Sequence, residues 1–143
     1  MTAQTDTAPA WMTPGTKVIV DQGRTSGSMY RGTITKVTKA QIIIDDGVRF
    51  SRRDLYKIGH STWDTTKILN PDDPSSEIAW LEYQQKKLRG NLQYDIERLL
   101  KEFGRTGAVT FAEQARDRIA EVSSRYNARA AKIAQLTAAA KQG

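Results

Sequence analysis

Four cations and an aromatic side chain crowd into a short stretch near the middle of the chain. Arg49, Arg52, Arg53 and Lys57 fall within nine residues, with Tyr56 among them. Guanidinium groups form paired hydrogen bonds with phosphates, and an aromatic ring between them can stack on a base or a sugar. The same kind of side chain precedes this stretch, so the candidate nucleic-acid-binding set also includes Arg24, Arg31, Lys36 and Lys39.

The rival interpretation of this cluster is an ordinary solvated surface. Exposed basic residues are common on any protein surface. In that case Arg52 or Arg53 would form an ion pair with Asp54 or Asp46. The residue types alone leave both interpretations open.

Catalytic chemistry lacks the residues that it would need. The chain has no Cys and a single His, His60, which makes a thiolate, a zinc cage or a Ser-His-Asp site hard to build. The adjacent carboxylates at 45–46 and 72–73 stand where turns and helix caps favour Asp. Glycines 23, 27 and 32 do not form the phosphate-loop pattern. We therefore predict no enzyme activity, no catalytic residue, no metal ion and no cofactor.

Charge and composition favour a polyanionic partner. The 143 residues contain 22 Lys and Arg against 16 Asp and Glu, a net charge of +6. Residues 1–60 hold 9 basic and 5 acidic side chains, against 13 and 11 in residues 61–143. No apolar run approaches the roughly 20 residues of a membrane span, and residues 1–10 lack the pattern of a signal peptide. These features predict a cytoplasmic protein that does not bind a membrane.

The elements that position the cations are short strands. After a mobile tail over residues 1–13, strands are expected at 16–20, 30–37, 41–44, 48–50 and 55–58, with a long loop at 21–29. Asp46-Gly47 predicts a type I′ hairpin turn. Five short strands cannot cover one another as a flat sheet, so a closed barrel is expected over 14–60. Its predicted core is Val18, Val20, Ile34, Ile42, Ile44, Phe50 and Ile58.

This order of strand, long loop, hairpin and short turn into a last strand resembles an SH3-like barrel of the Tudor or KOW kind. The stretch Arg49-Phe50-Ser51-Arg52-Arg53-Asp54, followed by Ile58-Gly59, is similar to uncharacterised small proteins of actinobacterial phages. The resemblance covers residues 14–63 and implies a five-stranded barrel. It does not choose a ligand, because SH3-like barrels bind RNA, DNA, peptides and methylated side chains alike.

The second half of the chain has helical periodicity. A linker at 61–74 ends in Asp73, a helix cap, with Pro74 in the first turn. One helix is expected from Ser75 to Phe103, stopped by Gly104. A capping box at Thr110–Glu113 begins a second helix that runs to about residue 140. The expected fold class is α+β: an SH3-like barrel and then an antiparallel two-helix coiled-coil hairpin over 75–140.

Apolar heptads set the expected register of this hairpin. Folding back near residue 107 pairs Leu88 with Tyr126 and Leu92 with Val122, and puts Gln85 opposite Arg129 in a polar layer. The full seam is predicted to contain Ile78, Leu81, Gln85, Leu88, Leu92, Asp95 and Leu99 of the first helix with Ala115, Ile119, Val122, Tyr126, Arg129, Ile133 and Leu136 of the second.

An aromatic stripe lies opposite this seam. Trp80, Tyr83, Lys87 and Tyr94 recur at helical spacing on the outer side of the first helix. A two-helix coiled coil leaves that side uncovered, which predicts a partner or oligomer interface. A homodimer through the hairpin is favoured, because two-fold dimers are the commonest assembly.

Two functions follow from these elements. The first is a non-enzymatic nucleic-acid-binding accessory protein, with the basic barrel face on phosphates and the hairpin for oligomerisation or a second partner. The alternative is a protein–protein interaction adaptor, a phage factor that engages a host protein or a virion component. A steep loss of nucleic-acid affinity with salt distinguishes the first from the second.

Overall fold

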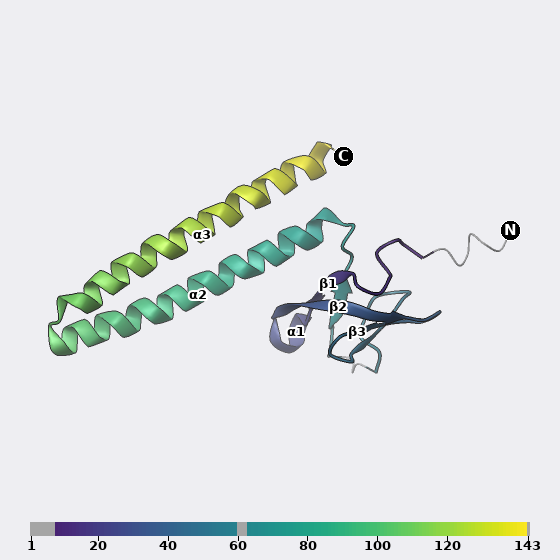
Figure 1. The fold of residues 1–143 in the computed structure, drawn as a ribbon, viewed down its shortest axis with the longest axis horizontal. Helices are drawn as coiled ribbons and strands as arrows, with labels where there is room; N and C mark the ends of the chain where they lie inside the picture. Colours follow the sequence, from purple (N-terminus) through teal and green to yellow (C-terminus); the bar gives the residue numbers. More distant parts are fainter. Residues whose placement is uncertain (1–7, 60–62, 143) are drawn as a thin grey trace. The chain divides into compact units, whose positions relative to one another are not determined.

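A computed structural model describes residues 8–59 and 63–142 of the chain (Figure 1). It divides into two compact units, Met1–Glu77 and Ile78–Gly143. The fold class is α+β, as predicted, with a five-stranded antiparallel, nearly closed barrel followed by two long helices. In chain order the elements are β1 (Lys17–Asp21), α1 (Gly23–Ser26), β2 (Met29–Val37), β3 (Gln41–Ile44), β4 (Arg49–Ser51), β5 (Lys67–Leu69), α2 (Pro74–Thr106) and α3 (Val109–Gln142).

The barrel closes through a connection and not through a fifth strand at 55–58. The strand order is β4-β3-β2-β1-β5, and the two edges are joined by the isolated bridges Phe50↔Lys57 and Tyr56↔Lys67. The predicted strand at 55–58 is therefore wrong. Leu55 has a φ of 68°, which no extended strand allows. The last strand is instead β5, inside the segment expected to be a linker.

The core contains the predicted residues except one, together with two residues that the sequence did not predict. Val18, Val20, Ile34, Ile42, Ile44 and Phe50 are all buried, whereas Ile58 is 38% exposed. The two additional core residues are Ile68 of β5 and Trp11, which is 7% exposed and packs in the same cluster. The expected tail at 1–13 is thus wrong for its described part, because a large aromatic ring anchors residues 8–13 to the barrel. Residues 1–7 lie outside the described residues.

The turn between β3 and β4 is not of type I′. A type I′ turn needs a positive φ at both central residues, here Asp46 and Gly47. Gly47 has a φ of 85°, but the φ of Asp46 is not positive, because Leu55 is the sole non-glycine residue with a positive φ in the described chain. Gly47 N–H donates to the Ile44 carbonyl and Val48 N–H donates to Asp46 Oδ1, each at 2.9 Å. These bonds define a three-residue loop with glycine in the left-handed position.

The helices begin and end at specific caps. Asp73 caps α2 as predicted, because its Oδ1 accepts the Ser75 N–H at 3.0 Å, a hydrogen bond that lowers the pKa of this carboxyl. The predicted stop at Gly104 and the predicted capping box at Thr110 are wrong, since both residues are helical. Gly107, at a φ of 69°, ends α2. Thr106 Oγ1 then accepts the Ala108 N–H at 3.1 Å just before α3.

The two glycines at this turn should respond oppositely to alanine. Gly104→Ala should raise the free energy of unfolding by about 0.5–1 kcal/mol, because alanine favours a helix interior and nothing lies near the added Cβ. Gly107→Ala should lower it by about 1–2 kcal/mol, because L-residues are strained at this positive φ. Urea unfolding followed by far-UV circular dichroism measures both. Changes of the same sign would contradict the assigned helix end.

The seam between α2 and α3 keeps the predicted antiparallel register with two changes. Leu81, Leu99, Ala115 and Val122 are buried. Ile119, expected in the seam, is 45% exposed. Arg118 takes its place and forms an ion pair with Asp95 at 3.0 Å, so a charged pair stands where the sequence predicts Asp95 and Ile119.

The second polar layer is present, but one of its predicted partners is wrong. Arg129 Nε donates to Gln84 Oε1 at 3.0 Å, not to Gln85. Gln85 Nε2 donates instead to the Tyr126 carbonyl at 3.4 Å. Successive residues of a helix point about 100° apart, so Gln84 and Gln85 lie on different flanks of the seam.

Candidate nucleic-acid interface

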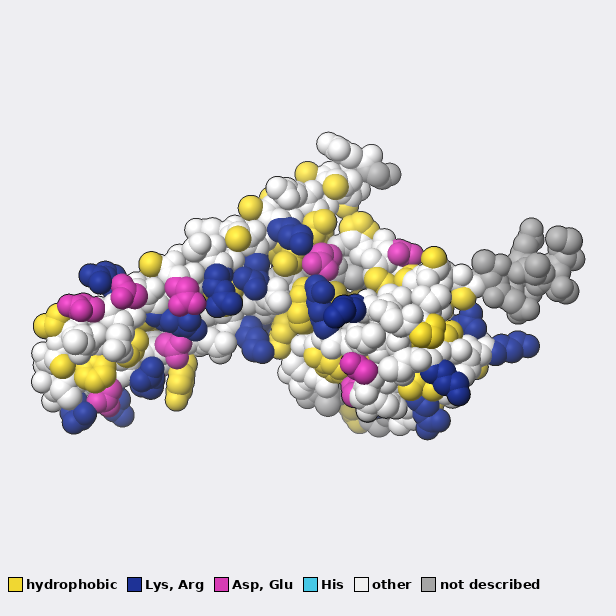
Figure 2. All heavy atoms as spheres, in the orientation of Figure 1, with side chains coloured by type: hydrophobic (Ala, Val, Ile, Leu, Met, Phe, Trp, Pro, Cys, Tyr) yellow, Lys and Arg dark blue, Asp and Glu magenta, His cyan; other side chains and the backbone are white. Residues whose placement is uncertain are grey.

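Five of the nine predicted cation and aromatic positions lie together at one end of the barrel. Lys36 and Arg49 flank Ile43 on the outer face, in the cross-strand register Lys36↔Ile43↔Arg49. Adjacent strands lie about 4.8 Å apart, which places these two cations about 10 Å from each other. We call this surface the basic end and define it as Lys36, Lys39, Arg49, Arg52 and Arg53. Figure 2 shows basic side chains gathered at one end of the barrel.

Arg52 has a structural task at the basic end. Its Nη1 donates to the carbonyls of Thr38 and Lys39 at 2.9 and 3.0 Å, and its backbone N–H donates to the Ala40 carbonyl. The side chain therefore holds the turn between β2 and β3. Its charge contributes to the local potential, while Nη1, one of its three guanidinium nitrogens, is used in these two hydrogen bonds. Lys36, Lys39, Arg49 and Arg53 are exposed to solvent.

An open groove of about 520 Å³ borders the basic end. Its basic wall is formed by Lys39, Arg52 and Arg53, and its apolar wall by Pro9 and Met12 of the N-terminal segment, with Ala8, Ala40 and Ser51 completing it. Pro9 and Met12 were missed by sequence reasoning, which treated them as tail. Trp11 between them was the available signal, because a tryptophan in a polar segment is more often anchored than free.

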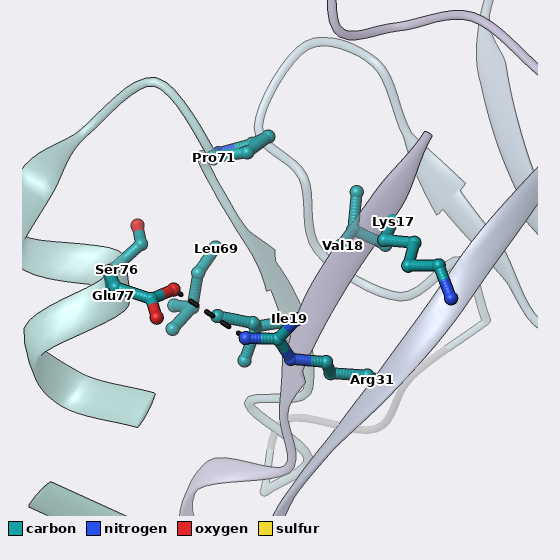
Figure 3. A pocket seen from close by; sticks show the side chains of 8 residues that line it. All are labelled: Lys17, Val18, Ile19, Arg31, Leu69, Pro71, Ser76 and Glu77. Atoms are coloured by element: carbon teal, nitrogen blue, oxygen red, sulfur yellow. Dashed lines mark ion pairs between the residues drawn. The ribbon is translucent and has the colours of Figure 1, made fainter. Parts of the chain in front are cut away.

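The remaining predicted residues are engaged elsewhere in the barrel unit. Arg31 forms an ion pair with Glu77 at 3.7 Å, at the edge of a separate pocket of about 90 Å³ (Figure 3). Lys57 forms an ion pair with Asp64, also at 3.7 Å. The Lys67 ammonium lies 5.7 Å from the centre of the Tyr56 ring, so this ring already holds a cation. The backbone of Arg24 is in α1, and its side chain is outside the described part.

The acidic side chains nearest in sequence are engaged in turns, and Asp54 Oδ1 accepts the Tyr56 N–H at 3.1 Å. Asp45 and Asp46 occupy the turn between β3 and β4, where Tyr30 Oη donates to Asp46 at 2.9 Å. Burial, this hydrogen bond and the two nearby carboxylates raise the pKa of the Tyr30 phenol. The Tyr30 phenol therefore stays protonated and donates its hydrogen bond to the Asp46 carboxylate. The rival ion pairs of Arg52 or Arg53 with Asp54 or Asp46 do not occur among the described residues.

The aromatic stripe on α2 is only partly exposed. Tyr94 is 69% exposed and Lys87 is also exposed, whereas Trp80 and Tyr83 are half-buried with their ring centres 6.0 Å apart. Other large apolar side chains of the helical unit also reach solvent, namely Leu100, Phe103, Val109 and Ile119. The uncovered apolar surface is therefore broader than the stripe that the sequence predicts.

Comparisons with known proteins give this chain no relatives. No protein-family model, no curated protein and no solved structure matches it. Within the described ranges, no group of three metal-binding side chains and no helix long and apolar enough to cross a membrane occurs. His60 lies outside the described residues.

Proposed function

We propose that this chain is a non-enzymatic nucleic-acid-binding protein whose barrel contacts phosphates through the basic end. The supporting observation is the concentration of exposed cations there. Lys36, Lys39, Arg49 and Arg53 reach solvent, and Lys39 and Arg53 line an open groove with Arg52 fixed beside them. Clustered cations neutralise phosphates and release counterions, which drives binding without reading sequence.

The test is binding of the full chain to a labelled random-sequence DNA duplex, measured by fluorescence anisotropy over a salt series. Arg49→Glu with Arg53→Glu should weaken binding about 100-fold at low salt, since removing one charged hydrogen bond to a phosphate costs ~1.5 kcal/mol. The magnitude of the negative slope of log affinity against log salt concentration should decrease by about 2, because two phosphates are no longer neutralised.

The matched control is Lys17→Glu, compared with Arg49→Glu alone. Both residues are exposed strand cations, and both substitutions change the net charge equally. Equal reductions in affinity would show that net charge alone drives binding and not the basic end. Absence of binding by the unaltered chain at low salt would reject the proposed function.

A second candidate is the protein-interaction adaptor, including a host or virion protein as partner. It is favoured by the exposed apolar residues of the helical unit, with Tyr94 at 69% and Val109 at 61% exposed. Surfaces of this kind mark protein-binding sites. A second copy of the chain on the same surface would produce the homodimer, which stays a prediction.

A further inference from the structure

The net charge of the protein lies in its helices and not in its barrel. Residues 1–77 carry 10 basic and 9 acidic side chains, whereas residues 78–143 carry 12 and 7. Sequence reasoning placed the excess in the N-terminal part because it divided the chain at residue 60. The segment 61–77 adds one Lys and four acidic residues to the barrel unit and reverses that conclusion.

Within the hairpin the charge is segregated along the helices. Asp95 pairs with Arg118, so residues 78–94 of α2 lie beside residues 119–142 of α3. These two segments, which we call the basic half, hold 7 basic and 2 acidic side chains. Residues 95–118, the neutral half, hold 5 of each. The entire excess of +5 in the helical unit is therefore confined to the basic half.

Local ion pairs sharpen this contrast. In the neutral half, Arg105 pairs with Glu102 at 2.7 Å and Arg116 with Asp117 at 3.2 Å. In the basic half, Arg125 pairs with Glu121 at 3.6 Å. Lys86, Lys87, Arg89 and Lys132 have no ion-pair partner within the part of the chain that the structure describes.

The cations of the basic half border the seam on both flanks. Arg125, Arg129 and Lys132 recur at steps of four and three along one side of α3, where Arg129 reaches Gln84 of α2. On the other flank Arg89 lines a groove of about 280 Å³ with Ser123 and Asn127. Guanidinium, hydroxyl and amide donors around an apolar floor suit a phosphate and its sugar.

We propose that the basic half is a second phosphate-binding surface, which holds the backbone of a nucleic-acid duplex. The inference rests on the proposed function, which supplies the same ligand class. Lys86, Lys87 and Arg89 lie within one turn of α2, and Lys86 and Arg89, three residues apart, share the side of the helix that borders the groove, where clustered positive charge attracts a polyanion. A single strand would require several exposed aromatic rings for stacking. Here Tyr94 is exposed, but Trp80 and Tyr83 pack against each other.

A charge-reversal pair on α2 tests this surface in the full chain, with the same labelled duplex. Lys86→Glu with Arg89→Glu, two exposed residues three apart on one side of α2, should weaken binding at least tenfold and reduce the magnitude of the salt slope by about 2. Arg98→Glu with Lys101→Glu is the matched control: same helix, same change of net charge, exposed residues without ion pairs in the described chain, but in the neutral half. This control should change affinity by less than about threefold, because screening limits charges more than ~10 Å from the ligand.

The outcomes separate the two proposals. Equal reductions in affinity for both pairs, or none for the Lys86 and Arg89 pair, would overturn the second surface. If the basic-end variants no longer bind in that case, the proposed function still holds. No binding by the unaltered chain overturns both. Should circular dichroism show that the Lys86 and Arg89 variant is unfolded, Lys86→Gln with Arg89→Gln removes the same two charges with less change to the helix, and unchanged affinity would again reject the surface.

Discussion

Trp11→Ala is expected to lower the free energy of unfolding of the barrel unit by about 3–5 kcal/mol. The side chain is 7% exposed and packs against the core that includes Phe50 and Ile68. Removing it leaves a cavity and releases the N-terminal segment, which also lines the groove at the basic end. Chemical unfolding followed by near-UV circular dichroism measures the change in stability.

Two further tryptophan variants sharpen this prediction. Trp63→Ala is the control, because Trp63 is 78% exposed and its removal should cost less than about 0.5 kcal/mol. Trp11→Phe should recover most of the stability, since the buried Trp11 Nε1 has no hydrogen-bond partner among the described residues and phenylalanine removes that donor. Similar small effects for Trp11→Ala and Trp63→Ala would show that residues 8–13 do not belong to the barrel.

Val122→Asp is expected to destabilise the hairpin by about 3–5 kcal/mol, because it buries a carboxylate at an apolar position of the seam. Val122 is 2% exposed. Ile119→Asp, three residues earlier on α3, should cost less than about 1 kcal/mol, because Ile119 is 45% exposed. Both substitutions introduce the same residue into the same helix, so differences in helix propensity cancel. Thermal unfolding followed by far-UV circular dichroism distinguishes the two variants. Equal losses of stability would show that Ile119 is part of the seam.

These two positions show the reach of sequence periodicity. Alternating steps of three and four identified both helices, their antiparallel pairing and a polar layer at Arg129. The same steps placed Ile119 in the seam, where Arg118 lies instead. The apolar pattern favours isoleucine at this layer, but Asp95 on the facing helix forms an ion pair with the neighbouring arginine. Asp95 and Arg118 are 23 residues apart in the chain, so the apolar spacing within one helix does not predict that they form a pair.

The candidate site shows the same division. Sequence placed nine cations and aromatics in one set, and the barrel separates them. Arg31, Lys57 and Tyr56 are engaged by Glu77, Asp64 and Lys67, residues that local clustering in the sequence does not connect to them. The charge balance of the two units likewise depended on where the chain divides, and the division lies inside α2.

By itself the sequence determined the features that local chemistry controls. Alternating β-branched residues built the barrel core, glycine and aspartate set the turn at 45–47, Asp73 capped α2, and heptads defined the hairpin. Only the tertiary structure decided the rest. It put the closing strand at Lys67–Leu69, because Leu55 bends the chain away from an extended path, and it buried Trp11 of the expected tail. These outcomes depend on which surfaces meet after folding, and burial is a property of the assembled chain and not of any one segment.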